Sequence, residues 1–416
     1  METNYKEVKE CRICGSERLE PVLNLGLQSV IAFPEKQDAE LPKAPLEVVM
    51  CSNCTMLQLR YSFNKEMLYR EYWYESGTSP TMVRALKDVV DNAINVAKLD
   101  KGDTVLDIAC NDGTLLNQYP DNENIRRIGV DPSNVIPKNV NGLQIINDFF
   151  PSKKLEDFLN GDTVKIITCC AAFYDILKPN EFVEGIRKIL KPNGIFVVQM
   201  NYLGLMVENK TYDDICIEHE LFYSLKALEL LLGRHGMEVI DLELNDVNGG
   251  SIRAYIKQSG SALAVEGGKA RVERLRLWER SIELDRLGTY QRFSRSIEEN
   301  RQRVLKFIGE ELKKGKVFHI RGASTRGLTQ VQFMGLTNRE VKFVEDANPR
   351  KWDRFYADTK IRIIRPDEAA KLKADYKIVL PYHFIAEISN GEKPFLKEGG
   401  KLIVLIPEFR VIAGNQ

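Results

Sequence analysis

The sequence predicts an α/β protein centred on a doubly wound, seven-stranded sheet, with a small N-terminal metal-binding domain and a C-terminal Rossmann-like domain. Apolar strands alternate with helical patterns from residue 104 to about residue 258, which is typical of a parallel sheet covered by helices on both faces. Two Cys-x-x-Cys pairs precede this region, and a second strand-loop-helix pattern follows it. Because a chain of 416 residues usually forms more than one hydrophobic core, we expect domains at residues 1–80, 81–260 and 261–416.

The N-terminal segment carries four cysteines in two Cys-x-x-Cys pairs, Cys11 with Cys14 and Cys51 with Cys54. Each pair can present two thiolates from one tight turn, and two pairs complete the tetrahedral site that structural Zn²⁺ prefers. A redox role is the alternative, but two pairs without a thioredoxin-like context disfavour it. Four thiolates leave no open position on the metal, so we expect this zinc to be structural.

An aromatic and hydroxyl-rich stretch, which includes Tyr72, Tyr74 and Ser76, precedes a helical pattern over residues 82–98. Two interpretations are equally open. The stretch is either a flap that faces the substrate or a packed linker between domains.

The first strand of the central region, residues 105–108, runs into a loop of small and polar residues, after which we expect a helix to begin. A loop that binds pyrophosphate needs the pattern Gly-x-Gly-x-x-Gly, whereas this one has Ala109, Asn111 and Gly113. Asp107 and Asp112 would repel a diphosphate but suit a ligand that carries an ammonium and a sulfonium group. The loop therefore predicts S-adenosylmethionine, although small residues are also common in ordinary turns.

The later strands of the sheet supply the remaining cofactor candidates. Asp131 ends the second strand, where a carboxylate can accept hydrogen bonds from both ribose hydroxyls. Asp148 and Ala171, which follow the third and fourth strands, complete the expected cofactor set. The five predicted strands are residues 105–108, 128–130, 143–146, 165–169 and 195–200, and an antiparallel pair at 238–244 and 252–256 is expected at the edge.

The segments after the fourth and fifth strands should face the substrate, because ligands of such sheets bind at the carboxyl ends of the strands. His219 is the candidate general base, since among the four histidines it alone follows a strand of the central sheet at the expected site. The adjacent Glu218 can orient the imidazole and make it more basic. Neighbouring side chains of an extended segment point to opposite sides, so a shared site needs an irregular backbone. A surface histidine beside acidic neighbours is the alternative.

Residues 263–314 have helical spacing with many Arg and Glu residues, and they predict a helical connector. The chain then begins a second Rossmann-like unit, with strands expected at residues 316–320, 341–345, 376–380 and 401–405. Its loop contains Ser324 and Arg326 between glycines, and the next strand ends in Asp346. Hydroxyls, a helix N-terminus and an arginine suit phosphate, so we expect a nucleotide diphosphate here. An ordinary turn is the alternative.

Six motifs occur in this chain in an order that resembles the sugar C-methyltransferases, which act on nucleotide-linked 4-keto-deoxysugars. The motifs are the Cys-x-x-Cys pairs, Tyr72-x-Tyr74-x-Ser76, Asn111-Asp112-Gly113, Glu218-His219, Gly249-Gly250-Ser251-x-Arg253 and Gly322-Ala323-Ser324. The resemblance covers nearly the whole chain. It implies a zinc-bearing N-terminal domain, a central S-adenosylmethionine domain, and a C-terminal domain that helps to bind the sugar nucleotide.

The resemblance also implies a mechanism, in which a base removes the proton next to the ketone and the enolate attacks the methyl group. His219 would be this base, Glu218 its supporting carboxylate, and Tyr74 a substrate or cofactor contact. The chain has Cys216 where the family usually has tyrosine, and Asp175 and Asn248 where histidines are common, which fits a divergent member with a different sugar or acceptor atom. The expected substrate-binding residues are Tyr72, Ser76, Asp175, Asn201, Cys216, Tyr223, Asn248, Arg253, Ser324, Arg326 and Asp346.

The composition excludes several other classes of protein. Lys plus Arg and Asp plus Glu each number 59, which argues against nucleic acid as a partner. No apolar run is long enough to span a bilayer, the first residues lack the apolar core of a signal peptide, and eight cysteines are too few for a disulfide scaffold. We therefore expect a cytoplasmic monomer or homodimer with a small-molecule substrate. Transfer of the methyl group to oxygen or nitrogen, a noncatalytic sugar-nucleotide-binding module, and an NAD-dependent oxidoreductase remain the rival hypotheses.

Overall fold

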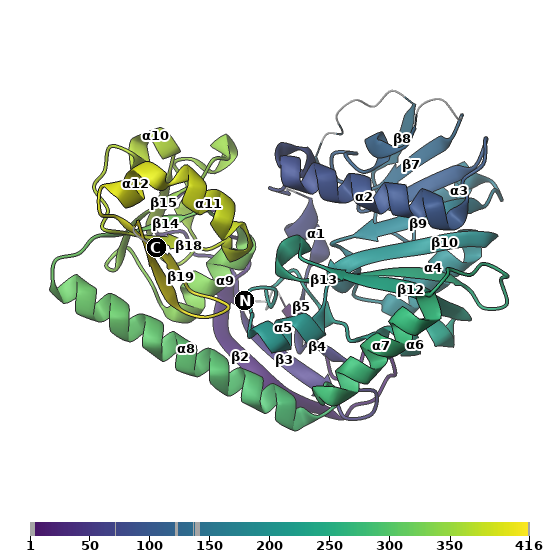
Figure 1. Cartoon of the computed structure of the whole chain (residues 1–416), viewed down its shortest axis with the longest axis horizontal. Helices are drawn as coiled ribbons and strands as arrows, with labels where there is room; N and C mark the ends of the chain where they lie inside the picture. Colours follow the sequence, from purple (N-terminus) through teal and green to yellow (C-terminus); the bar gives the residue numbers. More distant parts are fainter. Residues whose placement is uncertain (1–4, 71, 121–123, 136, 138–141, 415–416) are drawn as a thin grey trace.

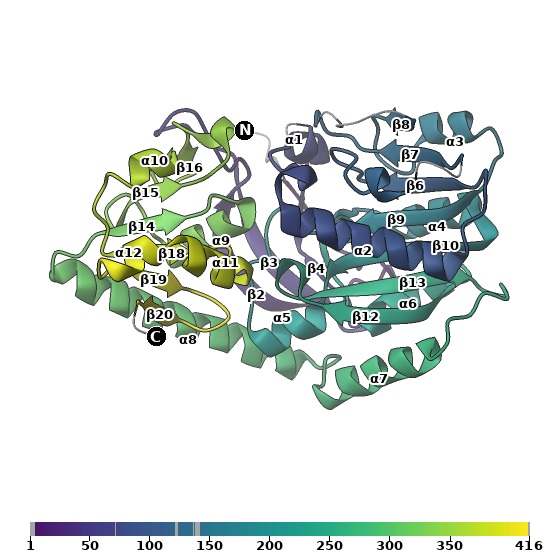
Figure 2. The ribbon, with the colours of Figure 1, turned by 45° about the horizontal axis from the view of Figure 1, so that its top comes forward.

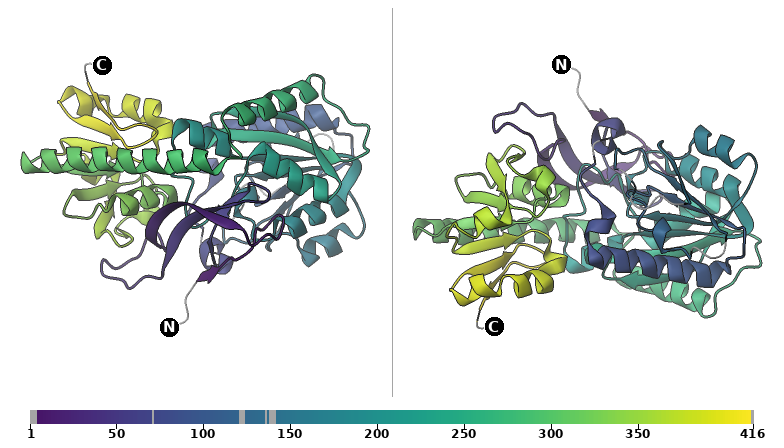
Figure 3. Two further views of the ribbon diagram at one scale, coloured as in Figure 1. Left: turned by 90° about the horizontal axis from the view of Figure 1, so that it is seen from below. Right: turned by 90° about the horizontal axis from the view of Figure 1, so that it is seen from above.

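The computed structural model describes residues 5–70, 72–120, 124–135, 137 and 142–414. The described residues form two seven-stranded sheets, joined by a four-stranded sheet and a long helical connector. The two α/β domains lie side by side, and the N-terminal sheet lies at their junction (Figure 1; Figure 3).

The central sheet has the strand order β12-β13-β10-β9-β6-β7-β8, which confirms the prediction of a seven-stranded sheet with an antiparallel pair at one edge. Central strands are almost entirely buried, as expected for a parallel sheet covered on both faces. The strands are β6 (Thr104–Ile108), β7 (Arg126–Val130), β8 (Leu143–Ile146), β9 (Val164–Cys170), β10 (Leu190–Asn201), β12 (Met237–Asn245) and β13 (Ser251–Gln258).

Helices cover both faces of this sheet (Figure 2). Helix α2 (Pro80–Ala97) covers one face, and it begins where the Ser79 side chain accepts a hydrogen bond from the amide of Met82. Its buried stripe, which includes Leu86, Val89 and Val90, packs against the sheet. The other helices of this domain are α3 (Lys153–Leu159), α4 (Pro179–Ile189), α5 (Leu203–Asn209) and α6 (Leu225–Arg234).

The expectation of a helix directly after the first loop is wrong. In the described part of the chain between β6 and β7, only the 3₁₀ turn η2 (Leu116–Gln118) forms. Pro120 lies two residues beyond η2 and cannot donate the backbone hydrogen bond that a continuing helix needs. A helix N-terminus is therefore missing from this loop, so that a ligand at this position would meet side chains and backbone amides instead.

The N-terminal sheet includes a strand from the central part of the chain. Strand β11 (Leu221–Phe222), which lies two residues after His219, pairs antiparallel with β4 (Leu57–Leu59). The order is β11-β4-β3-β2, with β2 at Leu19–Ser29 and β3 at Lys43–Cys51. A separate two-stranded sheet joins β1 (Tyr5–Glu7) and β5 (Tyr61–Phe63), and the short helix α1 (Lys65–Tyr69) follows.

The C-terminal domain is a second, mostly parallel sheet with the order β16-β17-β15-β14-β18-β19-β20. The four predicted strands correspond to β14 (Phe318–Arg321), β15 (Val341–Glu345), β18 (Tyr376–Val379) and β19 (Lys401–Val404). The structure adds β16 (Phe355–Tyr356), β17 (Ile361–Ile364) and β20 (Arg410–Ala413), and the helices are α9 (Thr325–Met334), α10 (Pro366–Ala369), α11 (Ile385–Gly391) and α12 (Lys393–Lys397).

The helical connector consists of α7 (Gly268–Ser281) and α8 (Leu287–Lys313). Helix α8 runs along the C-terminal domain toward α7, which packs beside the central sheet (Figure 1). Ile297, Val304 and Ile308 form the buried stripe of α8, as the helical spacing predicts. No helix among the described residues is both long and apolar enough to cross a membrane.

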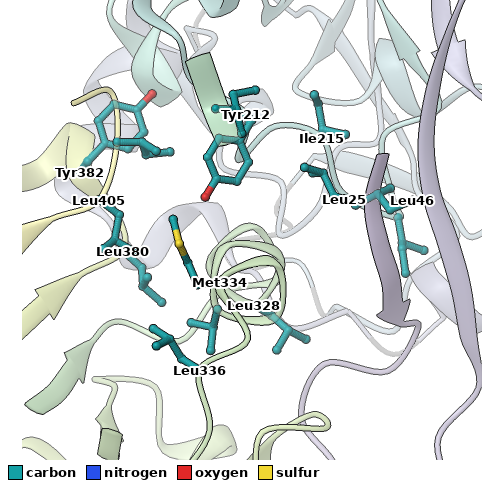
Figure 4. Packing of buried hydrophobic residues seen from close by; sticks show 14 of the residues in the cluster. Leu25, Leu46, Tyr212, Ile215, Leu328, Met334, Leu336, Leu380, Tyr382 and Leu405 are labelled. Atoms are coloured by element: carbon teal, nitrogen blue, oxygen red, sulfur yellow. The ribbon is translucent and has the colours of Figure 1, made fainter. Parts of the chain in front are cut away.

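One hydrophobic cluster joins all three parts of the chain (Figure 4). Tyr212 and Ile215, from the segment before His219, pack with Leu25 of β2 and with Leu328 and Met334 of α9. The backbone before and after His219 is thus anchored in the N-terminal and C-terminal domains.

Candidate functional site

A cavity of about 1750 Å³ lies where the N-terminal, central and C-terminal parts meet. Its lining includes the carboxyl ends of β6, β7, β9 and β10, the aromatic stretch after α1, and loops of the C-terminal domain. This is the position at which open α/β sheets bind ligands. The volume is large enough for a nucleotide cofactor together with a second substrate.

The four cysteines of the N-terminal domain form one cluster whose sulfur atoms all lie within 4.8 Å of one another. The sulfurs of Cys11 and Cys54 are 3.4 Å apart, and those of Cys14 and Cys51 are 3.6 Å apart. These distances exceed a disulfide bond of about 2 Å and approach the ~3.8 Å edge of a tetrahedron with zinc–sulfur bonds of about 2.3 Å. The donor set and its geometry therefore fit a structural Zn²⁺ ion.

The loop after β6 has the tight backbone that close approach to a ligand requires. Ala109, Asn111 and Gly113 have φ values of 59°, 49° and 74°, so three residues within five adopt left-handed conformations. The amide of Asn111 donates to Oδ2 of Asp131 at 2.8 Å, which fixes this carboxylate at the end of β7. Ala109, Asn111 and Asp131 line the cavity, and this arrangement fits the ribose and amino-acid parts of S-adenosylmethionine.

The aromatic stretch is bonded directly to this loop. Oδ1 of Asn111 accepts from the amide of Ser76 at 3.0 Å, and its Nδ2 donates to the carbonyl of Tyr74 at 3.0 Å. Oδ2 of Asp112 accepts from the amide of Gly77 at 2.8 Å. A Cβ at Gly77 would lie 2.9 Å from Asp112 and Thr114, so this approach requires glycine. Because Tyr72, Tyr74 and Ser76 also line the cavity, the geometry favours the flap over the linker.

The other expected cofactor residues divide into two groups. Asp148 and Ala171 line the cavity. Asp107 lies beneath the loop, only 3% exposed, where its carboxylate accepts from the hydroxyl of Thr168 at 2.6 Å. Burial raises the pKa of Asp107 to about 7. Asp107 therefore supports the loop from below, and Asp112 does so through the flap.

His219 lies on an irregular turn, as a site shared with Glu218 requires. Its amide donates to the carbonyl of Cys216 at 3.2 Å, and its imidazole contacts the Tyr174 ring, with centroids 4.2 Å apart. Nδ1 lies 2.6 Å from the carbonyl oxygen of Asp214, which can only accept, so Nδ1 carries the proton and Nε2 has the free lone pair. Burial and then Arg326 lower the pKa of His219 to about 3, so the ring is neutral near pH 7.

The Glu218 side chain does not contact Nδ1 of His219, although we expected it to support the ring. Its Oε2 accepts from the hydroxyl of Thr325 at 3.3 Å, and its main-chain carbonyl accepts from the hydroxyl of Tyr69 at 3.0 Å. Burial raises the pKa of Glu218 to about 7. The carbonyl of Asp214 orients the imidazole instead.

Glu220, which the sequence analysis missed, anchors the same turn to the zinc-binding domain. Its fully buried carboxylate forms ion pairs with Arg12 at 2.5 Å and with Lys65 at 3.1 Å. Arg12 lies between two zinc-binding cysteines and also donates to the carbonyl of Leu59 at 2.9 Å. The zinc site and the candidate base are thus linked through one buried ion pair and the strand β11.

Arg326 differs most from its expected role. Its guanidinium forms ion pairs with Asp213 and with Asp214, the latter at 3.0 Å, and these charges raise its pKa above the ordinary value. The Ser324 hydroxyl caps α9, and Asp346 accepts from the amide of Ala323 at 2.6 Å. These residues line the cavity, but the charge of Arg326 is already matched by two aspartates, which leaves a poor site for a diphosphate.

Cationic side chains lie nearby on the segment after β15. Arg350 and Arg354 each contact the Trp73 ring, with distances of 5.1 and 4.9 Å to its centroid. Lys351 lies 5.0 Å from the centroid of Phe33 and donates to the carbonyl of Ala323 at 2.6 Å. All of these residues line the cavity. Arg350 and Lys351 follow Asp346 closely in the sequence, but only the fold brings them to the aromatic flap.

Only some of the other predicted substrate-binding residues line the cavity. Asp175 and Asn248 line the cavity, whereas Asn201, Cys216, Tyr223 and Arg253 are buried behind its lining. Arg253 forms ion pairs with Asp88 at 2.8 Å and Glu243 at 2.7 Å. The expectation that His219 alone among the histidines lies at the substrate site is wrong, because His383 of η7 (Tyr382–Phe384) also lines the cavity.

Comparisons with known proteins agree with this geometry. The sequence profile of a zinc binding domain matches residues 11–69, that of a methyltransferase domain matches residues 81–242, and that of the C-methyltransferase C-terminal domain matches residues 246–407. The C-methyltransferase NovU of Streptomyces niveus is 28% identical over 421 residues, which covers all of this chain and 99% of NovU.

Two solved structures resemble part of the chain. The CcbJ methyltransferase of Streptomyces caelestis is 13% identical, with a TM-score of 0.35, and the match covers 45% of this chain and 94% of CcbJ. An S-adenosylmethionine-dependent methyltransferase of Clostridium acetobutylicum is 16% identical, with a TM-score of 0.35, and the match covers 43% of this chain and 92% of that one.

The profiles, the cofactor loop and the cysteine cluster define the class: this is an S-adenosylmethionine-dependent methyltransferase with a structural zinc site. More narrowly, the chain is similar over its whole length to a C-methyltransferase, and profiles of a zinc-binding, a methyltransferase and a C-methyltransferase C-terminal domain match it in this order.

Proposed function

We propose that this enzyme transfers a methyl group to the carbon next to the ketone of a nucleotide-linked keto-deoxysugar, through an enolate. The observation that carries the proposal is the state of His219. Its Nδ1 donates to the carbonyl of Asp214, which leaves Nε2 unprotonated on a ring that lines the cavity. A neutral imidazole with a free lone pair can accept a carbon-bound proton next to a ketone.

The cofactor and the residues around His219 would have separate roles in methyl transfer. S-adenosylmethionine, bound by Asn111, Asp131 and the flap, supplies an electrophilic methyl group. Nε2 of His219 takes the proton, and the hydroxyl of Tyr72 donates a hydrogen bond to the enolate oxygen. Burial raises the pKa of Tyr72 well above its usual value, so this hydroxyl keeps its proton. Closure of the cavity by the flap excludes water from the enolate.

The nucleotide diphosphate would lie against Arg350, Lys351 and Arg354 rather than in the loop around Arg326. These three cations face the cavity beside Trp73 and Phe33, and each has one carboxylate within 4 Å, whereas Arg326 is paired with two buried aspartates. Asp175, Asn248 and His383 would contact the sugar. We also propose the division into residues 1–80 for zinc, 81–260 for the methyl donor and 261–416 for the sugar nucleotide.

Solvent exchange tests the proposal. The enzyme is incubated in D₂O with a nucleotide 4-keto-6-deoxysugar and S-adenosylhomocysteine, which cannot donate a methyl group, and the sugar is then analysed by NMR. Enolate formation predicts enzyme-dependent deuterium uptake next to the ketone, and loss of this uptake in His219→Ala. Transfer to oxygen or nitrogen predicts no uptake. Full uptake by His219→Ala would reject the assigned base.

A further inference from the structure

Three side chains of different chemistry converge on the turn that carries His219. Cys216, Glu218 and His219 each offer one ligand atom, and the three atoms lie within 4.8 Å of one another. The hydrogen bond from the amide of His219 to the carbonyl of Cys216 closes the turn and brings the first and last side chains together. The mechanism proposed above does not use the thiol of Cys216.

We propose that Cys216, Glu218 and His219 form a second metal site, which binds Zn²⁺ with an open coordination position toward the cavity. A thiolate, a carboxylate and an imidazole are all ligands that zinc accepts, and three protein ligands with one open position are the usual arrangement of a non-structural zinc site. The four-cysteine cluster, by contrast, leaves no open coordination position on its metal. Binding releases the thiol proton, and any proton on the carboxylate, to the solvent, with no change in redox state.

The surroundings of the three side chains fit this role. Metal-binding histidines usually donate their other ring nitrogen to a carbonyl or a carboxylate, and Nδ1 of His219 donates to the carbonyl of Asp214. The carboxylate of Glu218 is held by the hydroxyl of Thr325. Oδ1 of Asp175, whose carboxyl group interacts electrostatically with Cys216 and Glu218, is buried and has no hydrogen-bond partner among the described residues. This oxygen remains available to interact with a bound cation.

Metal binding and catalysis would compete for the same lone pair. Since Nδ1 of His219 is already bonded, the metal must use Nε2, which is the atom that we assign as the base. Zinc at this site would therefore block proton removal and raise the apparent KM for the sugar. This consequence rests on the proposed function, whereas metal binding itself does not.

The test uses the full-length protein with its four-cysteine site already loaded with zinc. Further Zn²⁺ is titrated against a chromophoric chelator, and bound metal is counted by mass spectrometry after removal of free ions. We expect two equivalents in the wild type and one in Cys216→Ala. The control is Cys170→Ala, which removes a thiol that lines the cavity outside the proposed site and should keep two equivalents. Binding of S-adenosylmethionine and circular dichroism verify that each variant is folded.

Cobalt provides a readout that identifies the ligand. Co²⁺ added to the zinc-loaded wild type should give a thiolate-to-cobalt absorption band that Cys216→Ala lacks. One equivalent of zinc in the wild type, or a second equivalent that survives in Cys216→Ala, would reject the site. Two equivalents in the wild type with neither a lower kcat nor a higher KM for the sugar would support the metal site and reject His219 as the base.

Discussion

The buried ion pair between Arg12 and Glu220 makes the most specific prediction. The Arg12 and Glu220 side chains are 5% and 0% exposed, and their charged atoms are 2.5 Å apart. Removing one partner of a buried pair usually costs about 3–5 kcal/mol, because the other charge stays buried without compensation. Lys65 remains 3.1 Å from Glu220, so we expect Arg12→Met to lower the free energy of unfolding by about 3 kcal/mol, at the lower end of that range.

The same substitution should lower activity, because Glu220 follows the candidate base directly. Chemical denaturation measures the stability, and kcat and zinc content are measured on the same samples. Arg18→Met is the matched control, since Arg18 is an exposed arginine of the same domain, and its effect should stay within about 0.5 kcal/mol. Unchanged stability and kcat in Arg12→Met would refute the proposed link between the zinc-binding domain and the turn at His219. Loss of zinc from this variant would instead attribute the change in stability to the cysteine cluster.

Three further predictions concern single side chains. Between pH 5 and pH 8, the free energy of unfolding of Asp107→Asn should rise by about 2 kcal/mol relative to that of the wild type. The reason is that a carboxyl group whose pKa is raised to about 7 loses its stabilising contribution as the pH rises from about 4 through 7. Denaturation at both pH values measures this, and a pH-independent difference would contradict it. His219→Ala should lower kcat by about 10³-fold while binding of S-adenosylmethionine by calorimetry stays unchanged; a smaller loss than about 10-fold would exclude a general base. Arg350→Ala should raise the KM for the nucleotide sugar by about 10-fold. Arg339→Ala, which changes an exposed arginine, should leave the KM unchanged. Equal effects of the two substitutions would contradict the assigned diphosphate site.

Periodic patterns explain why much of the fold could be predicted from the sequence. The strands of both large sheets are apolar segments with turn residues between them, and the buried stripe of α8 follows helical spacing. Most of the strands that were missed are short or lie at edges, but β3 of the N-terminal sheet has nine residues and is internal. Strand β11 has two residues, so no local pattern distinguishes it, and it forms only because β4 offers a free edge.

The site was predictable where its residues share one motif. The four cysteines, the Asn111 loop and the turn at His219 are local in sequence. By contrast, the partners of Arg326 lie more than a hundred residues away, and neither its pairing with Asp213 nor the approach of His383 has a local signal. The role of Arg12 likewise depends on Glu220, 208 residues later. Charge partners across domains follow from packing, which single-sequence patterns do not contain.

Transfer of a labelled methyl group tests the central claim most directly. The enzyme is incubated with S-adenosylmethionine labelled with ¹³C in its methyl group and with a panel of nucleotide 4-keto-6-deoxysugars, and the products are analysed by NMR. The account predicts a new methyl signal joined to the sugar carbon next to the ketone. A labelled methyl on oxygen or nitrogen, or no transfer to any keto-sugar by a protein that binds the cofactor, would contradict it.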